Sequence, residues 1–400
     1  MRILHVLTQL PAKTGSGVYF TNLIESFKEM GIENGAIYGS EEGLDLKVDA
    51  QYKNEVIYNT KDLPFHICGM SDVMPYPSTV YGEMSEEEID LLLDKFKEKL
   101  EEAKRDFKPD LVISHHLFIV TDLVRRVFDD RKVIGISHGT DLRQVLKYGR
   151  FLKRLENIRN LDKVLTVTPL ENKNIEEILK VDREKIHLVG GGYNEKIFFP
   201  EDIKNEEKIR IMYAGKISRS KGVFELAKTL PILEEKHKNL ELHIVGNADK
   251  ESEELLKKNA NYSDRLKLYD AENQETMAIH LKASDIFVLP SYFEALGLIA
   301  IEALACNKLV VTSEIKGLRE FLDNEIIENK LIEFTELPTI YDVDKPVEDE
   351  TDDYVKRLAI NIEKQIERLD QDLFTEEIED KIRTYSWENL GQRILKIIKD

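Results

Sequence analysis

Cysteine, long apolar runs and positive charge are all scarce in this chain of 400 residues. Two cysteines, Cys68 and Cys306, are too few for a disulfide framework, so we expect a reducing compartment. No uninterrupted apolar run approaches the roughly 18 to 20 residues that span a bilayer. Lysine and arginine total 57 against 76 acidic residues, and the resulting net charge of −19 repels nucleic acid. These shortages exclude a disulfide-rich scaffold, a transmembrane protein and a nucleic-acid-binding protein.

The amino-terminal residues 1–7 lack the cleavage-like segment of a signal peptide, and they are expected to form a buried strand. The sequence therefore predicts a soluble, cytoplasmic protein that would meet a membrane only peripherally. Its length and a hydrophobic content of 42% suit two domains, each with its own core.

Short apolar segments alternate with helix-length segments, as in parallel strands buried on both faces. In the first half the expected strands are residues 3–7, 111–114, 133–137 and 164–167. In the second half they are residues 209–214, 240–245, 266–269, 286–289 and 309–312. The pattern predicts an α/β protein with two Rossmann-like, doubly wound domains.

A proline and a charged run at residues 199–202 mark the expected domain boundary. The predicted domains are residues 1–200 with 385–400, and residues 201–384. The last segment, residues 385–398, is expected to be an amphipathic helix. Ser85, followed three residues later by Glu88, predicts a capped helix that extends to Phe107.

Two carboxylates, Glu294 and Glu302, are the only charges in the apolar segment 291–305. Burying a carboxylate among apolar residues costs several kcal/mol unless hydroxyl or cationic partners satisfy it. Gly297 is expected to precede a helix whose first N–H groups, near Leu298, would attract a diphosphate. The alternative is a buried helix with one paired glutamate and one surface glutamate.

The Glu-x7-Glu spacing, followed by Ala303 to Cys306 and an apolar strand, resembles the retaining glycosyltransferases of family 4, also called glycosyl transferases group 1. The resemblance implies the GT-B architecture, in which two Rossmann-like domains face a cleft and the C-terminal helix crosses back to the first domain. It also implies an acceptor-side first domain and a nucleotide-sugar-binding second domain. By the same resemblance, Glu294 contacts the donor sugar as a catalytic residue and Glu302 contacts the ribose.

The segment from Gly215 to Gly222 resembles the family's Gly-Arg-Leu-x-x-x-Lys-Gly, whose Arg and Lys hold the donor diphosphate. Lys221 matches the lysine. Lys216 replaces the arginine, which keeps the charge but loses the bidentate fork. We expect both lysines to be catalytic, because neutralising the leaving diphosphate is the main electrostatic demand of the reaction. Gly215 is expected to bind the donor, and a basic turn before a helix is the alternative.

Gly17 and His138 carry the resemblance in the first half. The family has paired glycines near the donor phosphates, and Gly17 keeps the second while Ser16 replaces the first. His138 ends an expected strand, where open α/β sheets bind ligands. The string His-Gly-Thr-Asp resembles the family segment beside the donor sugar, so His138 is predicted to be catalytic. A structural histidine is the alternative, and His116 is expected to line the acceptor site.

Arg143, Lys147, Arg150 and Arg154 are spaced by four, three and four residues, so they would share one face of a single helix. In so acidic a chain this face suggests a negatively charged acceptor or an anionic lipid surface. A solvated helix face is the alternative.

No metal site and no cofactor are expected. The Asp-x-Asp strings at 342–344 and 370–372 lie in an acid-rich tail and do not follow a strand of the first half. The resemblance implies a metal-independent hexosyltransferase-type enzyme that uses a UDP- or GDP-sugar, with the acceptor attacking from the same face. Its acceptor would be a glycan, a lipid-linked molecule or a small molecule. A glycan phosphorylase, a nucleotide-sugar epimerase and a non-catalytic subunit of another transferase remain as alternatives.

Overall fold

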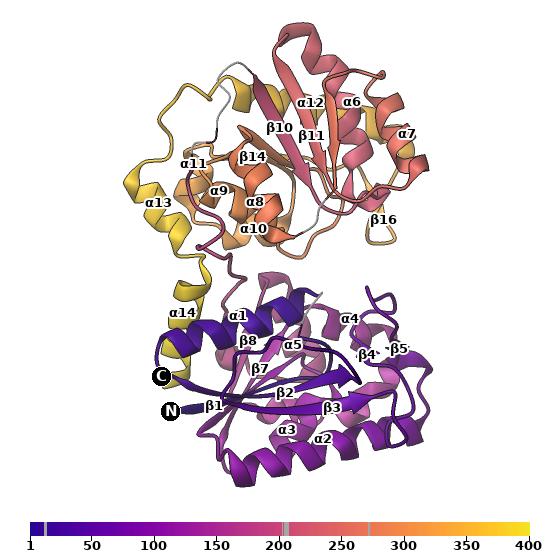
Figure 1. Ribbon diagram of the computed structural model, residues 1–400, viewed down its shortest axis with the longest axis vertical. Helices are drawn as coiled ribbons and strands as arrows, with labels where there is room; N and C mark the ends of the chain where they lie inside the picture. The colour runs from indigo at the N-terminus through magenta and orange to yellow at the C-terminus, as the bar shows by residue number, and fades with distance from the viewer. Residues whose placement is uncertain (12–13, 202, 204–207, 271–272) are drawn as a thin grey trace. The chain divides into compact units, whose positions relative to one another are not determined.

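The computed structural model of the chain describes residues 1–11, 14–201, 203, 208–270 and 273–400. They form two compact units, one of residues 1–191 with 387–400 and the other of residues 192–386. Each unit is built on its own parallel sheet (Figure 1). The boundary expected at 199–202 includes Asp202, which lies outside the described residues; the units divide after Gly191 and after Ser386.

The first unit contains seven parallel strands in the order β3-β2-β1-β6-β7-β8-β9. They are β1 (Arg2–Leu7), β2 (Glu33–Glu41), β3 (Tyr52–Tyr58), β6 (Leu111–His115), β7 (Lys132–Ser137), β8 (Lys163–Thr166) and β9 (Ile186–Leu188). Two short strands, β4 (Cys68–Gly69) and β5 (Thr79–Val80), pair with each other. The chain winds outward from β1 on one side and from β6 on the other, so the switch point lies between these two strands.

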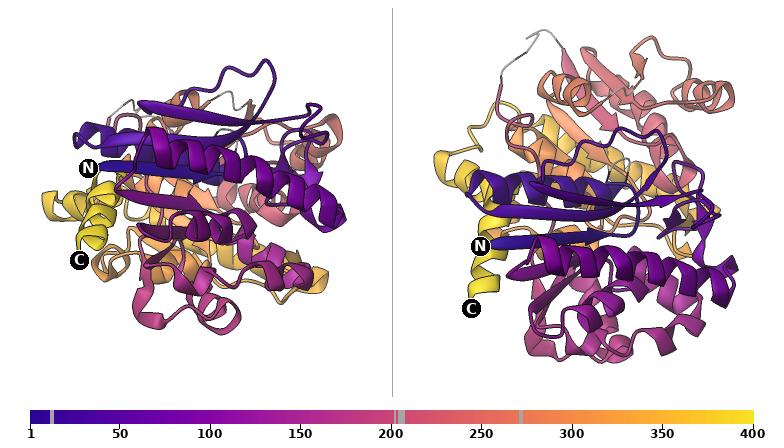
Figure 2. Two further views of the ribbon diagram at one scale, coloured as in Figure 1. Left: turned by 90° about the horizontal axis from the view of Figure 1, so that it is seen from below. Right: turned by 60° about the horizontal axis from the view of Figure 1, so that its bottom comes forward.

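Helices cover both faces of this sheet. They are α1 (Gly15–Glu29), α2 (Glu86–Asp106), α3 (Ile119–Val127), α4 (Thr140–Lys147), α5 (Asn172–Leu179) and α14 (Trp387–Lys399). Alternate side chains of β1 serve opposite faces, because Leu4 and Val6 pack with α2 and α3 while Ile3 packs with α1 and α14. Figure 2 shows α2 along one face of the strands and α1 along the other.

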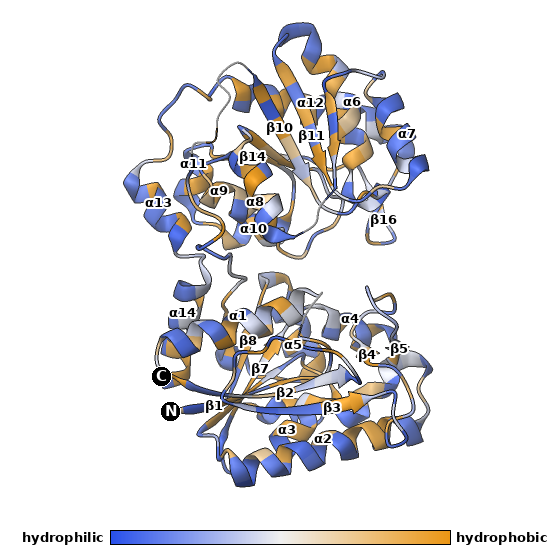
Figure 3. Cartoon of the chain, viewed as in Figure 1, coloured by the Kyte–Doolittle hydropathy of each residue, from blue (hydrophilic) through white to orange (hydrophobic). Residues whose placement is uncertain are grey.

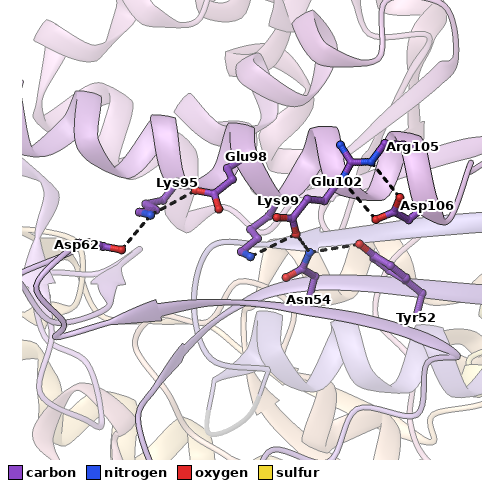
Figure 4. A network of polar contacts seen from close by, with 9 residues as sticks. All are labelled: Tyr52, Asn54, Asp62, Lys95, Glu98, Lys99, Glu102, Arg105 and Asp106. Atoms are coloured by element: carbon purple, nitrogen blue, oxygen red, sulfur yellow. Dashed lines mark hydrogen bonds and ion pairs between the residues drawn. The ribbon is translucent and has the colours of Figure 1, made fainter.

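Helix α2 begins with the predicted capping box. Ser85 Oγ accepts a hydrogen bond from the Glu88 N–H at 3.1 Å, and the Glu88 carboxylate accepts one from the Ser85 N–H at 2.8 Å. Further along, the helix binds the edge strand β3, where Asn54 donates to Glu102 at 2.7 Å and to the Tyr52 hydroxyl at 3.2 Å (Figure 4). The hydrogen bond from Asn54 is the first cause that lowers the pKa of Glu102. The contact between Asn54 and Glu102 thus ties the outer strand β3 to α2.

The second unit contains six parallel strands in the order β12-β11-β10-β13-β14-β15. They are β10 (Ile209–Ala214), β11 (Leu240–Val245), β12 (Leu266–Tyr269), β13 (Ile286–Leu289), β14 (Leu309–Ser313) and β15 (Ile332–Thr335). The switch point lies between β10 and β13, which pair directly. A hairpin of β16 (Ile340–Tyr341) and β17 (Lys345–Pro346) turns at the first Asp-x-Asp string, residues 342–344.

The helices of the second unit surround this apolar sheet. They are α6 (Val223–Lys236), α7 (Lys250–Asn259), α8 (Gln274–Lys282), α9 (Leu298–Ala305), α10 (Lys316–Phe321), α11 (Asn324–Glu328), α12 (Thr351–Ile366) and α13 (Glu376–Arg383). Figure 3 shows that α7 and α13 are mostly hydrophilic, whereas the strands and α9 are mostly hydrophobic. Helix α9 is therefore held by burial, and its position is set by the sheet.

The terminal helix α14 returns to the first unit, as the sequence predicted. Ser26 Oγ on α1 donates to the Trp387 carbonyl at 3.1 Å, and the Tyr19 and Trp387 rings meet edge to face at 5.0 Å. Gly391 faces Ser26 so closely that an added Cβ would collide with the Ser26 hydroxyl. The missing side chain at Gly391 thus lets α14 approach α1.

Every strand expected from the sequence is present. In the two large sheets β2, β3, β9 and β15 were missed, as were the short strands β4, β5, β16 and β17. Strand β2 reads Glu-Asn-Gly-Ala-Ile-Tyr-Gly-Ser-Glu and offers no apolar run. Its glycines are required by close contacts with residues far away in the sequence. A Cβ on Gly35 would lie 2.7 Å from the Phe107 ring, and one on Gly39 would lie 2.5 Å from the Thr8 carbonyl. Local pattern could not reveal this close packing.

Candidate functional site

The switch point of the second unit brings together the residues that the sequence singled out there. Gly215 and Lys216 follow the carboxyl end of β10, and Pro290 follows the carboxyl end of the neighbouring β13. The Tyr213 hydroxyl donates to the Lys216 carbonyl at 2.8 Å, which fixes the turn after β10. Gly215 itself has a φ of 149°, a backbone conformation that favours glycine. Both Gly215 and the Lys216 side chain are exposed.

Lys221 and Glu294 form the central contact of this site. The Lys221 ammonium lies 2.7 Å from Glu294 Oε1, and Ser291 Oγ donates to the same oxygen at 2.9 Å. The two side chains are 30% and 21% exposed, so the pair is shielded but within reach of a ligand. A cation and a carboxylate are thus held side by side near the carboxyl ends of β10 and β13.

Two glycines with positive φ allow the surrounding loops to approach each other. Gly222 has a φ of 61°, and an added Cβ would collide with the Pro290 carbonyl. Gly297 has a φ of 73° and is the N-cap of α9, which begins at Leu298 as predicted. The first turn of a helix has N–H groups without intrahelical acceptors and a partial positive charge. Because α9 begins only four residues after Glu294, its N-terminus, which attracts anions, lies at the same edge of the sheet as Glu294.

Glu302 lies inside α9 and is buried, with 6% of its surface exposed. Burial raises its pKa to about 8. A protonated carboxyl can donate one hydrogen bond and accept others, so Glu302 is suited to polar groups of a ligand. The burial expected from the sequence is present.

Gly17 lies in the first turn of α1, after the carboxyl end of β1. Its N–H donates to the Thr14 side chain at 3.0 Å, which caps the helix. Gln9 donates to Ser16 Oγ at 2.6 Å, so the loop is held from both sides. The Gly17 N–H is therefore used to bind the N-cap residue of α1, Thr14.

Histidines gather at the carboxyl ends of β6 and β7 in the first unit. His138 Nε2 lies 3.1 Å from His115 Nδ1, and the His116 ring centroid lies 4.8 Å from that of His138. Burial lowers the pKa of both His116 and His138 to about 3, and it lowers that of His115 well below its usual range. These imidazoles are therefore neutral at physiological pH, able to accept or donate a hydrogen bond but not to carry charge.

Two carboxyl groups beside this cluster were given no role by the sequence reasoning. Asp141 accepts hydrogen bonds from the Leu117 N–H at 2.7 Å and from Ser137 Oγ at 3.1 Å, and so joins α4 to the strand ends. Glu171 is also buried, and burial raises its pKa to about 7. Glu171 caps its own turn at Thr168, and a Thr-x-x-Glu string was the available signal.

The single basic helix predicted for residues 143–154 is wrong. Helix α4 ends at Lys147, Tyr148 leaves the helical conformation with a ψ of 72°, and a 3₁₀ helix (Gly149–Arg154) follows. A 3₁₀ helix has three residues per turn, so the spacing of four, three and four does not describe one face.

Three of the four predicted cations bind acceptors within their own unit. Lys147 pairs with Asp72, and Arg150 donates to the Tyr81 and Met84 carbonyls at 2.8 and 2.6 Å. Arg154 pairs with Glu86 at 2.6 Å and Asp90 at 2.7 Å. Arg143 also has an interaction partner. Arg150 and Arg154 thus bind the start of α2 and the residues just before it, and Lys147 binds Asp72 instead.

Within the described ranges, no group of three or more His, Cys, Asp or Glu side chains could hold a metal ion. A search of the same part of the chain found no helix long and apolar enough to cross a membrane.

Comparison with known families matches both halves of the chain. Residues 14–196 match the family described as Glycosyltransferase Family 4, and residues 194–336 match the family described as Glycosyl transferases group 1. Together the matches include Gly17, His138, Lys221, Glu294 and Glu302 within their ranges. They meet where the chain passes from one unit to the other.

Two curated relatives resemble parts of the chain. An uncharacterized glycosyltransferase of Methanocaldococcus jannaschii is 28% identical over 177 residues, 41% of this chain and 45% of that protein. The GPI3 subunit of phosphatidylinositol N-acetylglucosaminyltransferase from Saccharomyces cerevisiae is 25% identical over 212 residues, 51% of this chain and 45% of that protein. The matched region thus spans less than half of either relative.

Solved structures resemble the whole chain at low identity. A glycosyltransferase from Rickettsia africae has a TM-score of 0.70 at 18% identity, covering 100% of this chain and 97% of its own. An Anabaena protein solved in complex with UDP and glucose has a TM-score of 0.64 at 13% identity, covering 99% of both chains. At this identity the likeness establishes a shared fold.

Proposed function

Because this chain belongs to the glycosyltransferases of family 4 and has their two-domain GT-B fold, we propose that it is a hexosyltransferase-type enzyme. It moves a sugar from a nucleotide-sugar, linked to UDP or GDP, to the hydroxyl of an acceptor. The unit of residues 192–386 binds the donor, and the unit of residues 1–191 binds the acceptor. The UDP and glucose bound to the Anabaena protein of the same fold support a donor of this kind.

The observation that carries the proposal is the Lys221–Glu294 pair at the β10–β13 switch point. A nucleotide-sugar needs a cation for its diphosphate and a hydrogen-bond acceptor for its sugar hydroxyls, a few ångströms apart. The pair offers both, and the N-terminus of α9 adds a second positive end. Lys216 supplies a further mobile charge, and Glu302 is the acceptor for the ribose hydroxyls.

In the proposed reaction the bond between the anomeric carbon and the diphosphate oxygen breaks, and a bond to the acceptor oxygen forms on the same face. Lys216, Lys221 and the α9 amides near Leu298 stabilise the diphosphate as its charge grows. The leaving phosphate oxygen takes the acceptor proton, so no protein base and no metal ion are needed. His138, uncharged because of its burial, supplies a hydrogen bond beside the sugar.

The stereochemical part of the proposal has a direct test. NMR of the product formed from an α-linked donor sugar reports the configuration at the anomeric carbon. Retention supports same-face attack. Inversion would require an acceptor-activating base and would overturn the mechanism while leaving transfer intact.

A second candidate is a non-catalytic subunit of another transferase. The yeast relative is named as a subunit, and Lys216 stands where the family commonly has arginine. Slow hydrolysis of a donor without acceptor separates the two functions, because a scaffold that has lost turnover releases no nucleotide.

We do not expect the cations of residues 143–154 to bind a negatively charged acceptor or a membrane. Their local partners at Asp72, Glu86 and Asp90 support a structural role. An Arg154→Glu variant tests this directly. It should destabilise the first unit and leave vesicle binding and the acceptor KM unchanged, whereas weaker vesicle binding by a folded variant would restore the membrane hypothesis.

A further inference from the structure

The segment that carries Glu294 has little regular structure of its own. We call residues 290–297, which join β13 to α9, the donor loop. A loop that must hold a carboxylate in one place needs hydrogen bonds from the rigid elements around it. Two buried hydroxyls from outside the loop provide them.

Tyr354, in the first turn of α12, donates to the Pro290 carbonyl at 2.9 Å. Ser313, the last residue of β14, donates to the Ser291 carbonyl at 2.5 Å. Both Tyr354 and Ser313 are completely buried. The first two carbonyls of the donor loop are therefore each bound by a hydroxyl from a different element.

The segment after β10 also packs tightly against the Pro290 carbonyl. A Cβ added to Gly222 would collide with this carbonyl oxygen, so the close approach requires glycine. From there the Tyr292 N–H donates to the Ser220 carbonyl at 3.0 Å, one residue before Lys221. The Tyr354 hydroxyl is thus connected to the Lys221–Glu294 pair through the Pro290 carbonyl and the Tyr292–Ser220 hydrogen bond. Its ring lies 5.8 Å from that of Tyr292, so it supports the loop by packing as well.

We propose that Tyr354 is a positioning residue for Glu294, and that α12 with β14 holds the donor loop in the geometry that pairs Glu294 with Lys221. The inference rests on the proposed function and adds to it residues that do not touch the donor. Misplacing a reacting group by about an ångström can cost on the order of 10²-fold in rate, so loss of one such hydrogen bond is measurable in turnover.

Tyr354→Phe removes the hydroxyl and keeps the ring, and Gln365→Met is the matched control. Gln365 lies on the same helix, roughly 16 Å along its axis, and is completely buried. Its amide donates to the Val310 and Lys330 carbonyls at 3.0 and 3.1 Å. Tyr354→Phe therefore removes one hydrogen bond from α12 to a carbonyl and Gln365→Met removes two, but only the carbonyl that Tyr354 binds belongs to the donor loop.

The first readout is amide hydrogen exchange of the peptide that covers the donor loop. Tyr354→Phe should speed its exchange roughly two- to tenfold, as expected for the loss of one hydrogen bond. Ser313→Ala should do the same, and Gln365→Met should not. Unchanged exchange in Tyr354→Phe, or equal change in Gln365→Met, would overturn the positioning role.

The second readout is turnover of the nucleotide-sugar. Tyr354→Phe should lower kcat roughly tenfold with the Kd for UDP within about twofold of the wild type. Wild-type kcat in a Tyr354→Phe protein whose loop exchanges faster would also overturn the inference. Absence of turnover in the wild type with every donor would sink the proposed function, and the exchange comparison would then decide the positioning role alone.

Discussion

At the scale of the residue, the Lys221–Glu294 pair sets a competition that can be measured. Glu294 binds the Lys221 ammonium group, which is the cation proposed for the donor diphosphate. Glu294→Gln removes a negative charge beside the diphosphate and frees Lys221. We predict tighter binding of UDP, by up to roughly fivefold, since a partly exposed ion pair is worth at most about 1 kcal/mol. Isothermal titration with UDP measures it.

The same titration has a built-in control. Lys221→Met should weaken UDP binding, because it removes the cation and leaves Glu294. Turnover should be lost in both variants. Weaker binding of UDP to Glu294→Gln would mean that the carboxylate does not compete for Lys221, and would remove this pair from the account.

The raised pKa of Glu302 should make the stability of the folded protein depend on pH. Its pKa is raised to about 8 by burial in the folded protein, against an ordinary value of 4.5. The folded state therefore holds the proton more tightly than the unfolded state does, so the stabilisation is complete below pH 4.5 and is lost as the pH rises towards 8. Glu302→Gln cannot lose a proton, so its Tm should exceed that of the wild type by about 3 °C or more at pH 8.5. Melting curves that stay parallel from pH 5 to pH 8.5 would contradict this.

How far the sequence predicts the site differs between residues. Glu294, Lys221 and Gly297 became candidates because each belongs to a short sequence string, and the structure places these strings at the ends of the paired strands β10 and β13. Tyr354 and Ser313 could not be found, because their role depends on where a hydroxyl meets a carbonyl about 60 or about 20 residues away, which no local pattern records. The hydrogen bond between His115 and His138 joins the ends of two strands, and no local sequence pattern reveals it.

At the scale of the element, the contact of α14 with α1 depends on Gly391. Alanine is a better helix former than glycine by up to about 1 kcal/mol, yet its Cβ would collide with the Ser26 hydroxyl. We predict that the collision wins and that Gly391→Ala lowers the Tm of the first unit. Thermal denaturation followed by tryptophan fluorescence is suitable, because Trp387, the single tryptophan, lies in α14.

A second substitution tests the cause. Ser26→Ala removes the hydroxyl that the new Cβ of Gly391→Ala meets, although Met30 Cε would still lie 2.7 Å and the Ser26 Cβ 3.2 Å from it. The double variant should therefore recover part of the lost stability. A Gly391→Ala protein as stable as the wild type would show that α14 has room to shift.

The elements also show where sequence patterns succeed. Strands buried on both faces, such as β10 and β11, are short apolar runs and were predicted with their observed bounds. The basic helix failed because side-chain spacing was used without the backbone break at Tyr148, although Gly149, the next residue, is a typical helix-ending signal. Pairing of Lys147 and Arg154 with distant acids then accounts for the cations.

At the scale of the whole molecule, the hydrophobic cores of the two units share no residue among those described. We therefore predict two transitions in differential scanning calorimetry, one for each unit. UDP at about 100 times its Kd should stabilise the donor-binding unit by roughly 2.7 kcal/mol and raise only that transition, by several degrees. The Gly391→Ala variant identifies the other transition by lowering it. A rise of the Gly391-sensitive transition with UDP would place the nucleotide in the wrong unit.

Release of free nucleotide from a panel of UDP-, GDP- and ADP-sugars tests the central claim most directly, with Glu294→Ala measured beside the wild type. The account predicts release from one donor by the wild type and loss of that release in Glu294→Ala, while UDP binding persists. Silence of the wild type across the whole panel, with nucleotide still bound tightly, would contradict the transferase and favour a non-catalytic subunit.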